Sequence, residues 1–440
     1  MEKLRNSLHF YYAGMLILLA LVLGGGTDQG LWTDHLIEVA LLPALFLGLA
    51  HMAETRLTIA ARILSAATLC LMAVQFLPIL RSWPLPGLGP DIPHWAFYSP
   101  APQKSLESSL FMVGALGFFL FLSRFSDADQ ERLLNFLMVG LFVNLVAATV
   151  ELSYGHGATA GKDVFPYSLG AGLFTNRNHF SSLVYAMIPM LAYLTLWRRR
   201  LPAAYLGFLI LMLLVLFAAG SRAGMAIATT LAIVGLLWFW PRTQSPARKL
   251  AILATGVFVI AGIAWWFGFD SSIQNASRSV FYATTWRAIQ DHWLAGTGLG
   301  TFTLIYPSYE RTGQIVSVYA NHAHDEYLEL WLETGLAGLV LIGGFCALVV
   351  RHFSRSGLAE ASFIAIVAIM LHSLVDYPLR TFGLAIPFAF FAATVLSVRP
   401  HSSGEPVSHG HTTHRRKVVR HRRSREGAAV EPALDEAAAR

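Results

Sequence analysis

Apolar segments about 20 residues long recur along almost the whole chain, and this pattern restricts the possible folds more than any other feature. A helix of that length crosses the hydrocarbon core of a bilayer, which is about 30 Å thick. Of the 440 residues, 55% are hydrophobic and only 13% are charged, whereas soluble domains carry about 25% charged residues. The sequence therefore predicts an all-α polytopic membrane protein.

Twelve of these segments are predicted to be membrane-spanning helices. Lys3 and Arg5 precede the first one, as in a secretory signal peptide, but no small-residue cleavage site follows, so we interpret it as a helix of the mature protein. Cys70 and Cys346 lie inside apolar segments, which argues against a disulfide framework and against a thiolate metal site. The predicted spans are residues 8–25, 34–51, 57–79, 106–123, 132–151, 179–197, 201–219, 224–240, 250–268, 327–350, 358–375 and 381–398.

The Lys and Arg residues in the connections predict the orientation of the spans, because cytoplasmic loops are enriched in them. If the N-terminus is cytoplasmic, every short basic cluster falls on the cytoplasmic side, and the even number of spans makes the C-terminus cytoplasmic too. The residues placed at or just below the outer face by this orientation are Arg177, Arg222, Arg278, His324 and Asp376.

Composition divides the chain into four parts. Residues 1–268 hold the first nine predicted spans, residues 269–326 form a large periplasmic loop, and residues 327–398 hold the last three spans. Residues 399–440 are rich in arginine and histidine and predict a mostly disordered cytoplasmic tail. The basic residues of the tail suit anionic lipid better than nucleic acid. A histidine-rich metal site is the alternative, which the irregular spacing disfavours.

The first polar motif lies where the sixth predicted span begins, at Asn176-Arg177-Asn178-His179. The two asparagines can cap a helix, but capping does not explain an arginine and a histidine at the same place. A second arginine, Arg222, interrupts an apolar hairpin. An arginine at membrane depth is costly unless it is paired or functional, although snorkelling at a helix end is the simpler alternative.

The second motif begins at Arg278, includes Arg287, and ends in the glycine-rich run of residues 296–300. A phosphate-binding loop needs a strand before it and a helix after it. No such unit surrounds these glycines, so a nucleotide site is rejected and a chain reversal is the interpretation.

The third motif is His322-Ala323-His324-Asp325-Glu326, directly before the tenth predicted span. Two histidines with carboxylates are potential zinc ligands, but the helical spacing of zinc proteases is absent. We therefore predict no metal here, and a zinc site is the alternative.

Taken together, these motifs resemble the O-antigen ligase and polymerase family of bacterial envelope glycan transferases. The matching stretches are residues 172–180, 220–224, Arg278 with residues 296–300, and residues 324–328 with residues 333–338. The resemblance, strong over about residues 170–345, implies a GT-C-like membrane fold. It also implies glycan transfer from undecaprenyl diphosphate to an acceptor hydroxyl, on the periplasmic side of the inner membrane. The family commonly has asparagine after the histidine, where this chain has Asp325, so an amide-specific role at that position is in doubt.

The chemistry of such a transfer suggests roles for these residues. Arginine binds phosphate oxygens bidentately and keeps its charge, so Arg278 and Arg222, with Arg177 as a weaker third, are the candidate clamp for the diphosphate. The clamp would also stabilise the charge that grows on the leaving diphosphate. Histidine has an unperturbed pKa near neutrality, so His324 is the candidate general base. The other candidate residues are Arg287, His322 and Asp325, and either Asp325 or Glu326 is expected to orient the imidazole.

The resemblance also predicts the partners. They are an undecaprenyl-diphosphate-linked glycan, an acceptor, membrane lipid and a chain-length regulator, without nucleic acid and without a cofactor. The acceptor is another lipid-linked repeat, lipid A core or a protein side chain, and the sequence does not choose among them. Inversion of the anomeric centre is implied. A transporter or flippase is the rival function, but transporters typically show repeats and broken helices at the bilayer midplane, whereas the polar residues here concentrate in one outer loop.

Overall fold

The computed structural model describes residues 2–28, 30–81, 94–154, 165–199, 201–239, 245–247, 249–256, 262, 273–314, 319–355 and 357–398. The chain divides into one unit from Met1 to Val398 and a second from Arg399 to Arg440. The second unit is the predicted disordered tail, and it lies outside the described residues.

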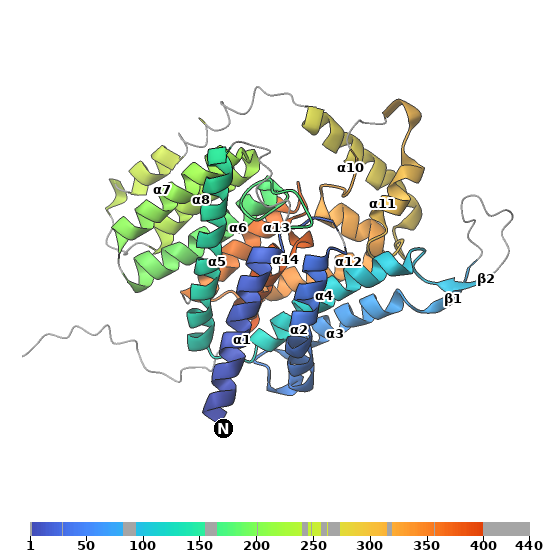
Figure 1. The fold of residues 1–440 in the computed structure, drawn as a ribbon, viewed down its shortest axis with the longest axis horizontal. Coiled ribbons are helices and arrows are strands. Elements are labelled where there is room, and N and C mark those ends of the chain that lie inside the picture. Colours follow the sequence, from blue (N-terminus) through green and yellow to red (C-terminus); the bar gives the residue numbers. More distant parts are fainter. Residues whose placement is uncertain are drawn as a thin grey trace, which may run out of the picture. The chain divides into compact units, whose positions relative to one another are not determined.

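Nearly all of the described chain is helical (Figure 1). Eight helices are long and apolar enough to cross a membrane, and three shorter apolar helices accompany them. The long helices are α1 (Glu2–Leu23), α2 (Trp32–Ala50), α4 (Pro102–Leu122), α5 (Asp127–Tyr154), α6 (Arg177–Ala192, continued by the π-helical segment Tyr193–Arg198), α7 (Pro202–Ala219), α8 (Arg222–Phe239) and α12 (Glu326–Arg351). The shorter ones are α3 (Ile59–Val74), α13 (Leu358–His372) and α14 (Phe382–Leu396).

These helices coincide with every predicted span except residues 250–268, most of which lie outside the described residues. The prediction of an all-α fold with many apolar spans is confirmed. The total of twelve spans and the GT-C-like arrangement stay predictions.

The segment predicted to be a large loop is itself mostly helical where it is described. It contains α10 (Ile273–His292), the short helix α11 (Phe302–Ile305) and the 3₁₀ turns Tyr306–Tyr309 and Thr312–Gln314. Elsewhere, the antiparallel strands β1 (Pro78–Arg81) and β2 (His94–Phe97) form a small hairpin before α4.

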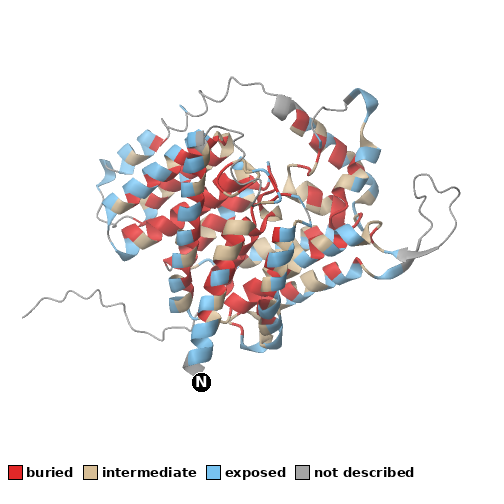
Figure 2. Ribbon diagram, in the orientation of Figure 1, coloured by how far each residue is buried: buried red, intermediate tan, exposed pale blue. Residues whose placement is uncertain are grey.

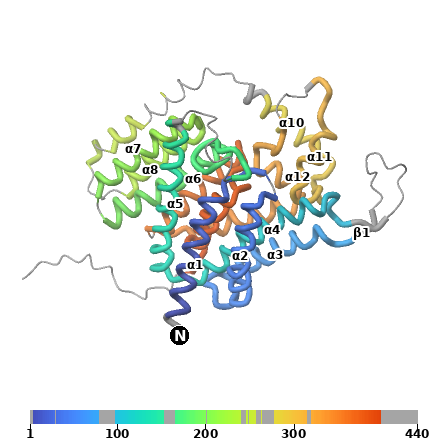
Figure 3. The backbone as a smooth tube through the Cα atoms, in the orientation of Figure 1, coloured from blue at the N-terminus to red at the C-terminus, as the bar shows by residue number. Residues whose placement is uncertain are grey.

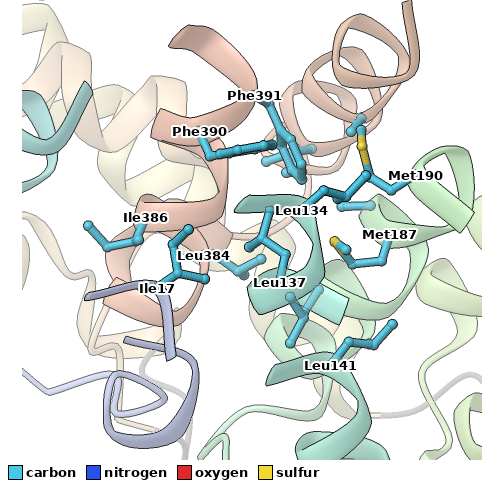
Figure 4. Close-up of a cluster of buried hydrophobic side chains, with 14 of the residues drawn as sticks. Ile17, Leu134, Leu137, Leu141, Met187, Met190, Leu384, Ile386, Phe390 and Phe391 are labelled. Atoms are coloured by element: carbon cyan, nitrogen blue, oxygen red, sulfur yellow. The ribbon is translucent and has the colours of Figure 1, made fainter. Parts of the chain in front are cut away.

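The core lies around α6, α13 and α14, where buried residues concentrate (Figure 2). Of the residues in the most apolar stretch of α6, 83% are buried, against 33% in the corresponding stretch of α7. A helix that is apolar on all sides is either buried or faces lipid, and these two helices show the two cases. Figure 3 shows α5 to α8 on one side of α13 and α14, with α2 to α4 and α12 on the other. Figure 4 shows part of this core, to which α1, α5, α6 and α14 contribute Ile17, Leu134, Met187 and Phe390.

The glycine-rich run of residues 296–300 docks onto a break in α12. Gly335 has φ 62° and ψ −152° inside that helix, and a Cβ there would lie 2.3 Å from the Leu294 carbonyl oxygen, so only glycine fits. The broken turn exposes helix carbonyls, which accept hydrogen bonds from the N–H groups of Thr297 (2.9 Å) and Gly298 (2.8 Å). Since α12 already uses these two N–H groups, they are not available to cradle a phosphate.

Candidate functional site

The centre of the site is Asp376, in the turn between α13 and α14. Its side chain is fully buried. Asn178 Nδ2 donates to Oδ2 at 2.6 Å, and the N–H of Tyr377 donates to Oδ1 at 3.0 Å. A buried carboxylate stays ionised only when it is hydrogen-bonded and paired with positive charge, and both conditions are met here.

Three basic side chains from three other segments surround this carboxylate. His324 Nδ1 lies 3.5 Å from Oδ1, His179 Nε2 lies 3.9 Å from the same oxygen, and Arg278 Nη2 lies 3.8 Å from Oδ2. Burial alone would raise the pKa of Asp376, but its interaction with the imidazole of His324 holds it below its usual range. The carboxylate is therefore ionised at neutral pH.

His324 is held in a strained conformation at the entrance to α12. Its φ of 55° is the only positive φ of a non-glycine residue in the described part of the chain, and such backbone strain is concentrated at functional sites in proteins. Tyr282 donates a hydrogen bond to the His324 carbonyl oxygen at 2.9 Å. The imidazole stacks on Phe281, at 5.8 Å between ring centroids, and meets Tyr377 edge-on at 5.0 Å. The two aromatic rings thus fix the imidazole against Asp376.

The carboxylate that faces this imidazole is not one of the two expected. Asp325 is the N-cap of α12, and its Oδ1 accepts from the N–H groups of Tyr327 at 2.9 Å and Leu328 at 3.0 Å. Glu326 accepts instead from the hydroxyl of Ser373 at 2.7 Å. Helix capping engages Asp325 locally, and the carboxylate that lies next to His324 is that of Asp376, which is remote in sequence.

His322 lies beside this cluster and shapes the loop. It is buried, its Nδ1 lies 2.8 Å from Glu329 Oε1, and its ring packs on Tyr377 at 4.2 Å. The same glutamate accepts from the N–H of Ala323 at 2.8 Å. These contacts fix the backbone that presents His324.

Two of the predicted arginines lie at helix starts next to Asn178. Arg177 is the first residue of α6, which Asn176 caps by accepting from the Asn178 N–H at 2.8 Å. A Cβ on Gly220 would lie 3.5 Å from Arg177 Nη1, so this arginine contacts the turn between α7 and α8. Arg222 begins α8 directly after that turn.

The same turn is tied to the centre of the site through one hydrogen bond. Ser221 Oγ donates to Asn178 Oδ1 at 3.0 Å, and Asn178 in turn bonds Asp376. Arg177, Arg222 and Arg278 therefore come from three elements that meet around one carboxylate. We call this end of the helices the site end and the opposite one the far end.

Arg287 is not part of this group. Its Nη2 donates to Thr284 Oγ1 at 2.8 Å and to the Tyr309 carbonyl oxygen at 3.1 Å. It lies nine positions after Arg278 on α10, and at 100° per residue nine steps reach the opposite face of a helix. Its described contacts tie α10 to the following 3₁₀ turn.

A buried ionic network next to the site escaped the motif analysis. Arg380 Nη1 lies 3.2 Å from Glu329 Oε1, and Nη2 lies 3.1 Å from Glu333 Oε2. Burial alone would lower the pKa of Arg380, but the two glutamates raise it. The network joins α12 to the turn that carries Asp376. The sequence did contain a signal for this network. Asp376 and Arg380 lie between two apolar spans, where a charged side chain is costly unless it is paired or functional.

A cavity of about 370 Å³ opens beside the network, between α2, α3, α4, α12 and α14. The charged residues that line it lie at the site end: Asp28, Asp34, Glu38, Glu107, His322, Glu326 and Arg380. Toward the far end the lining is apolar and includes Phe119, Phe345 and Leu396. We call this cavity the lipid groove. Among the described residues, no group of three or more His, Cys, Asp or Glu is arranged to hold a metal ion.

Residues 207–343 match one known protein family, and the match covers α8 and α10 and most of α7 and α12. That family is O-antigen ligase. The family resemblance predicted from the motifs is thereby confirmed, and no curated protein matches the chain. The domain includes Arg222, Arg278 and His324 but ends before Asp376.

This match supports glycosyl transfer of the O-antigen ligase or polymerase type, between a lipid-linked glycan and an acceptor. Together with the apolar helices, it makes the chain a multi-pass membrane protein.

Proposed function

We propose that this protein transfers a glycan from undecaprenyl diphosphate to an acceptor hydroxyl, on the periplasmic side of the bacterial inner membrane. The observation that carries the proposal is the convergence of His324 and Arg278 on the buried carboxylate of Asp376. The family match supports the type of reaction, and the arrangement of the side chains supports the roles.

His324 is proposed to be the general base. Its Nδ1 faces Asp376 at 3.5 Å, which leaves Nε2 to take the proton of the attacking hydroxyl. The imidazole becomes positively charged as it does so, and the buried carboxylate stabilises that charge. A positioned general base contributes about 10²–10⁴-fold to a rate.

The arginines are proposed to bind the diphosphate of the donor. Arg278 lies 3.8 Å from Asp376, and Arg177 and Arg222 lie at the helix starts that pack around Asn178. Guanidinium groups bind phosphate oxygens in pairs, so a diphosphate held here would place its sugar next to His324. The same arginines would stabilise the leaving diphosphate, and no cofactor is needed for this step.

The lipid groove is proposed to hold the isoprenoid chain of a lipid-linked glycan. Its lining along α12 runs from Glu326 to Phe345, which at 1.5 Å per residue is about 28 Å. One leaflet of the hydrocarbon core is about 15 Å thick, so the groove is too long for an acyl chain of one leaflet and suits a polyprenyl chain. The carboxylates at its mouth suit the hydroxyl groups of sugars.

The proposed orientation rests on the positive-inside rule. It places the site end in the periplasm, where the acceptor presents its hydroxyl, and places both termini in the cytoplasm. The chemistry is the same for a lipid-linked repeat, lipid A core or a protein side chain.

The experiment is transfer of a labelled undecaprenyl-diphosphate glycan by purified His324→Ala protein, measured as kcat and as donor Kd. We expect kcat to fall about 10²–10⁴-fold, with donor binding retained because the arginines and the groove remain. The matched control is His352→Ala, which removes a histidine from the C-cap of the same helix, at the far end. Wild-type kcat in the His324 variant would refute the role of base. Loss of wild-type activity in a chelator would assign His322 and His324 to a metal instead.

A further inference from the structure

A second cavity, of about 420 Å³, lies at the far end of α5 and α6. On α5 its lining residues are Ala128, Glu131, Arg132 and Asn135, and on the segment after α6 they are Leu194, Arg198 and Arg199. The candidate site lies at the other end of α6, where the helix begins with Arg177. Nothing in the proposed transfer uses this cavity.

The lining of the cavity has a surplus of positive charge. It contains three arginines and one carboxylate, and that carboxylate, Glu131, accepts from Arg198 Nε at 2.6 Å. Arg132 lies 3.3 Å from Asp129 in an exposed pair and sits over the ring of Phe10 at 4.5 Å. Arg199 has no side-chain hydrogen bond or ion pair within the described ranges. The charge of Arg199 thus remains after the pairs with Glu131 and Asp129 are counted.

The backbone after α6 places Arg198 and Arg199 in the lining of this cavity. The segment Tyr193–Arg198 is π-helical and Arg199 is its C-cap. A π-helical turn is wider than an α-helical one and is found frequently at functional sites. It brings Arg198 and Arg199 opposite Arg132 of the neighbouring helix.

An apolar stripe leads away from the cavity along α5. Val139, Phe142 and Val146 follow Asn135 at spacings of three or four residues, so all lie on the face that lines the cavity. Their exposures are 52%, 53% and 45%. Trp197, 45% exposed next to Arg198, is of the type that lies at the boundary between headgroups and hydrocarbon. A charged cavity continued by an apolar stripe is complementary to a lipid, because the cavity can hold the headgroup and the stripe can contact the acyl chains.

We propose that this cavity binds the phosphate headgroup of an anionic membrane lipid, whose chains lie along the stripe on α5. Basic pockets between membrane helices bind such headgroups through charge and hydrogen bonds. The same chemistry fits two sources, an anionic phospholipid and an isoprenoid phosphate. The site is separate from the transfer site, and the proposal does not depend on the proposed reaction.

The test is native mass spectrometry of the full-length protein in detergent, titrated with dioleoyl phosphatidylglycerol, undecaprenyl phosphate or dioleoyl phosphatidylcholine. We expect phosphatidylglycerol and undecaprenyl phosphate, which carry a net negative charge, to bind. Zwitterionic phosphatidylcholine should bind weakly. Since each basic residue contributes appreciably to binding anionic lipid, Arg132→Gln with Arg199→Gln should weaken binding about 30-fold. Arg199→Gln alone should weaken it about fivefold, without loss of any described side-chain contact.

The matched control is Arg351→Gln, which removes an arginine at the far end of α12, outside the cavity. Its affinity should stay at the wild-type value. Loss of binding for phosphatidylglycerol alone, or for undecaprenyl phosphate alone, in the cavity variants would identify the source and support the site. Wild-type affinity in the double variant, an equal loss in the control, or equal binding of phosphatidylcholine would overturn the proposal.

Discussion

The replacement Asp376→Asn is the most direct perturbation of the proposed mechanism, because it removes one charge and hardly changes the volume. Two unit charges at the 3.5 Å that separates His324 Nδ1 from Asp376 Oδ1 interact by about 5 kcal/mol at an effective dielectric constant of about 20. The amide oxygen of asparagine retains a dipole that we take to preserve about half of this. The loss, about 2.5 kcal/mol, corresponds to about 70-fold in rate.

This loss should appear in kcat, because the imidazole is charged only as the reaction proceeds. Donor KM should stay the same or fall, since Arg278 loses its carboxylate neighbour and is freer to bind a phosphate. The pKa of Asp376 is held below its usual range, so the carboxylate is ionised throughout neutral pH. The carboxylate itself therefore contributes no titration to the wild-type kcat between about pH 6 and pH 8.

The assay is transfer of a labelled undecaprenyl-diphosphate glycan by purified variants, with kcat and donor KM measured separately. Asp127→Asn is the matched control, because its carboxylate pairs with Arg56 at 2.6 Å where α5 begins, at the far end. It should keep wild-type kcat. A folded Asp376→Asn protein with wild-type kcat would refute the reasoning, and a rise in donor KM without a fall in kcat would place Asp376 in binding.

Three further predictions concern the arginines, the break in α12 and the orientation. Arg278→Lys and Arg222→Lys should reduce transfer at normal expression, because lysine cannot reproduce the planar fork, whereas Arg287→Lys should reduce it less; equal transfer by all three would count against the clamp. Gly335→Ala should lower the thermal midpoint in detergent, because the new methyl group would meet a backbone carbonyl at 2.3 Å, and an unchanged midpoint would contradict the account of the break. A cysteine in place of Glu310, in a background without other cysteines, should react with an impermeant reagent from the periplasm, and labelling only after the inner leaflet is breached would reverse the topology.

The sequence was a good guide to the spans because each is defined by a continuous apolar run. It also placed Arg177, Arg222, Arg278, His324 and Asp376 at one end, which is where the structure brings them together. The agreement arises because successive spans run in opposite directions, so every second connection lies on the same side of the membrane.

The parts that the sequence did not reveal depend on contacts between remote residues or on the phase of a helix. Asp325 is adjacent to His324 and looked like its partner, but the need to cap α12 engages it, and the facing carboxylate comes from a later turn. Arg287 looked like a companion of Arg278 while the segment was taken as a loop. Once the segment is a helix, the two lie on opposite faces. The buried face of α10 mixes Phe281, Ala288 and Ile289 with Thr284 and Thr285. The sequence therefore shows only a weak helical period there.

The position of Asp376 outside residues 207–343 has a consequence for exchanging parts between relatives. A graft of that domain would carry Arg222, Arg278 and His324 into a new host but would leave the carboxylate behind. The host would have to supply an acidic side chain from its own counterpart of the α13–α14 turn. On the proposed mechanism, functional hybrids should be those that inherit α12 and the α13–α14 turn from the same parent.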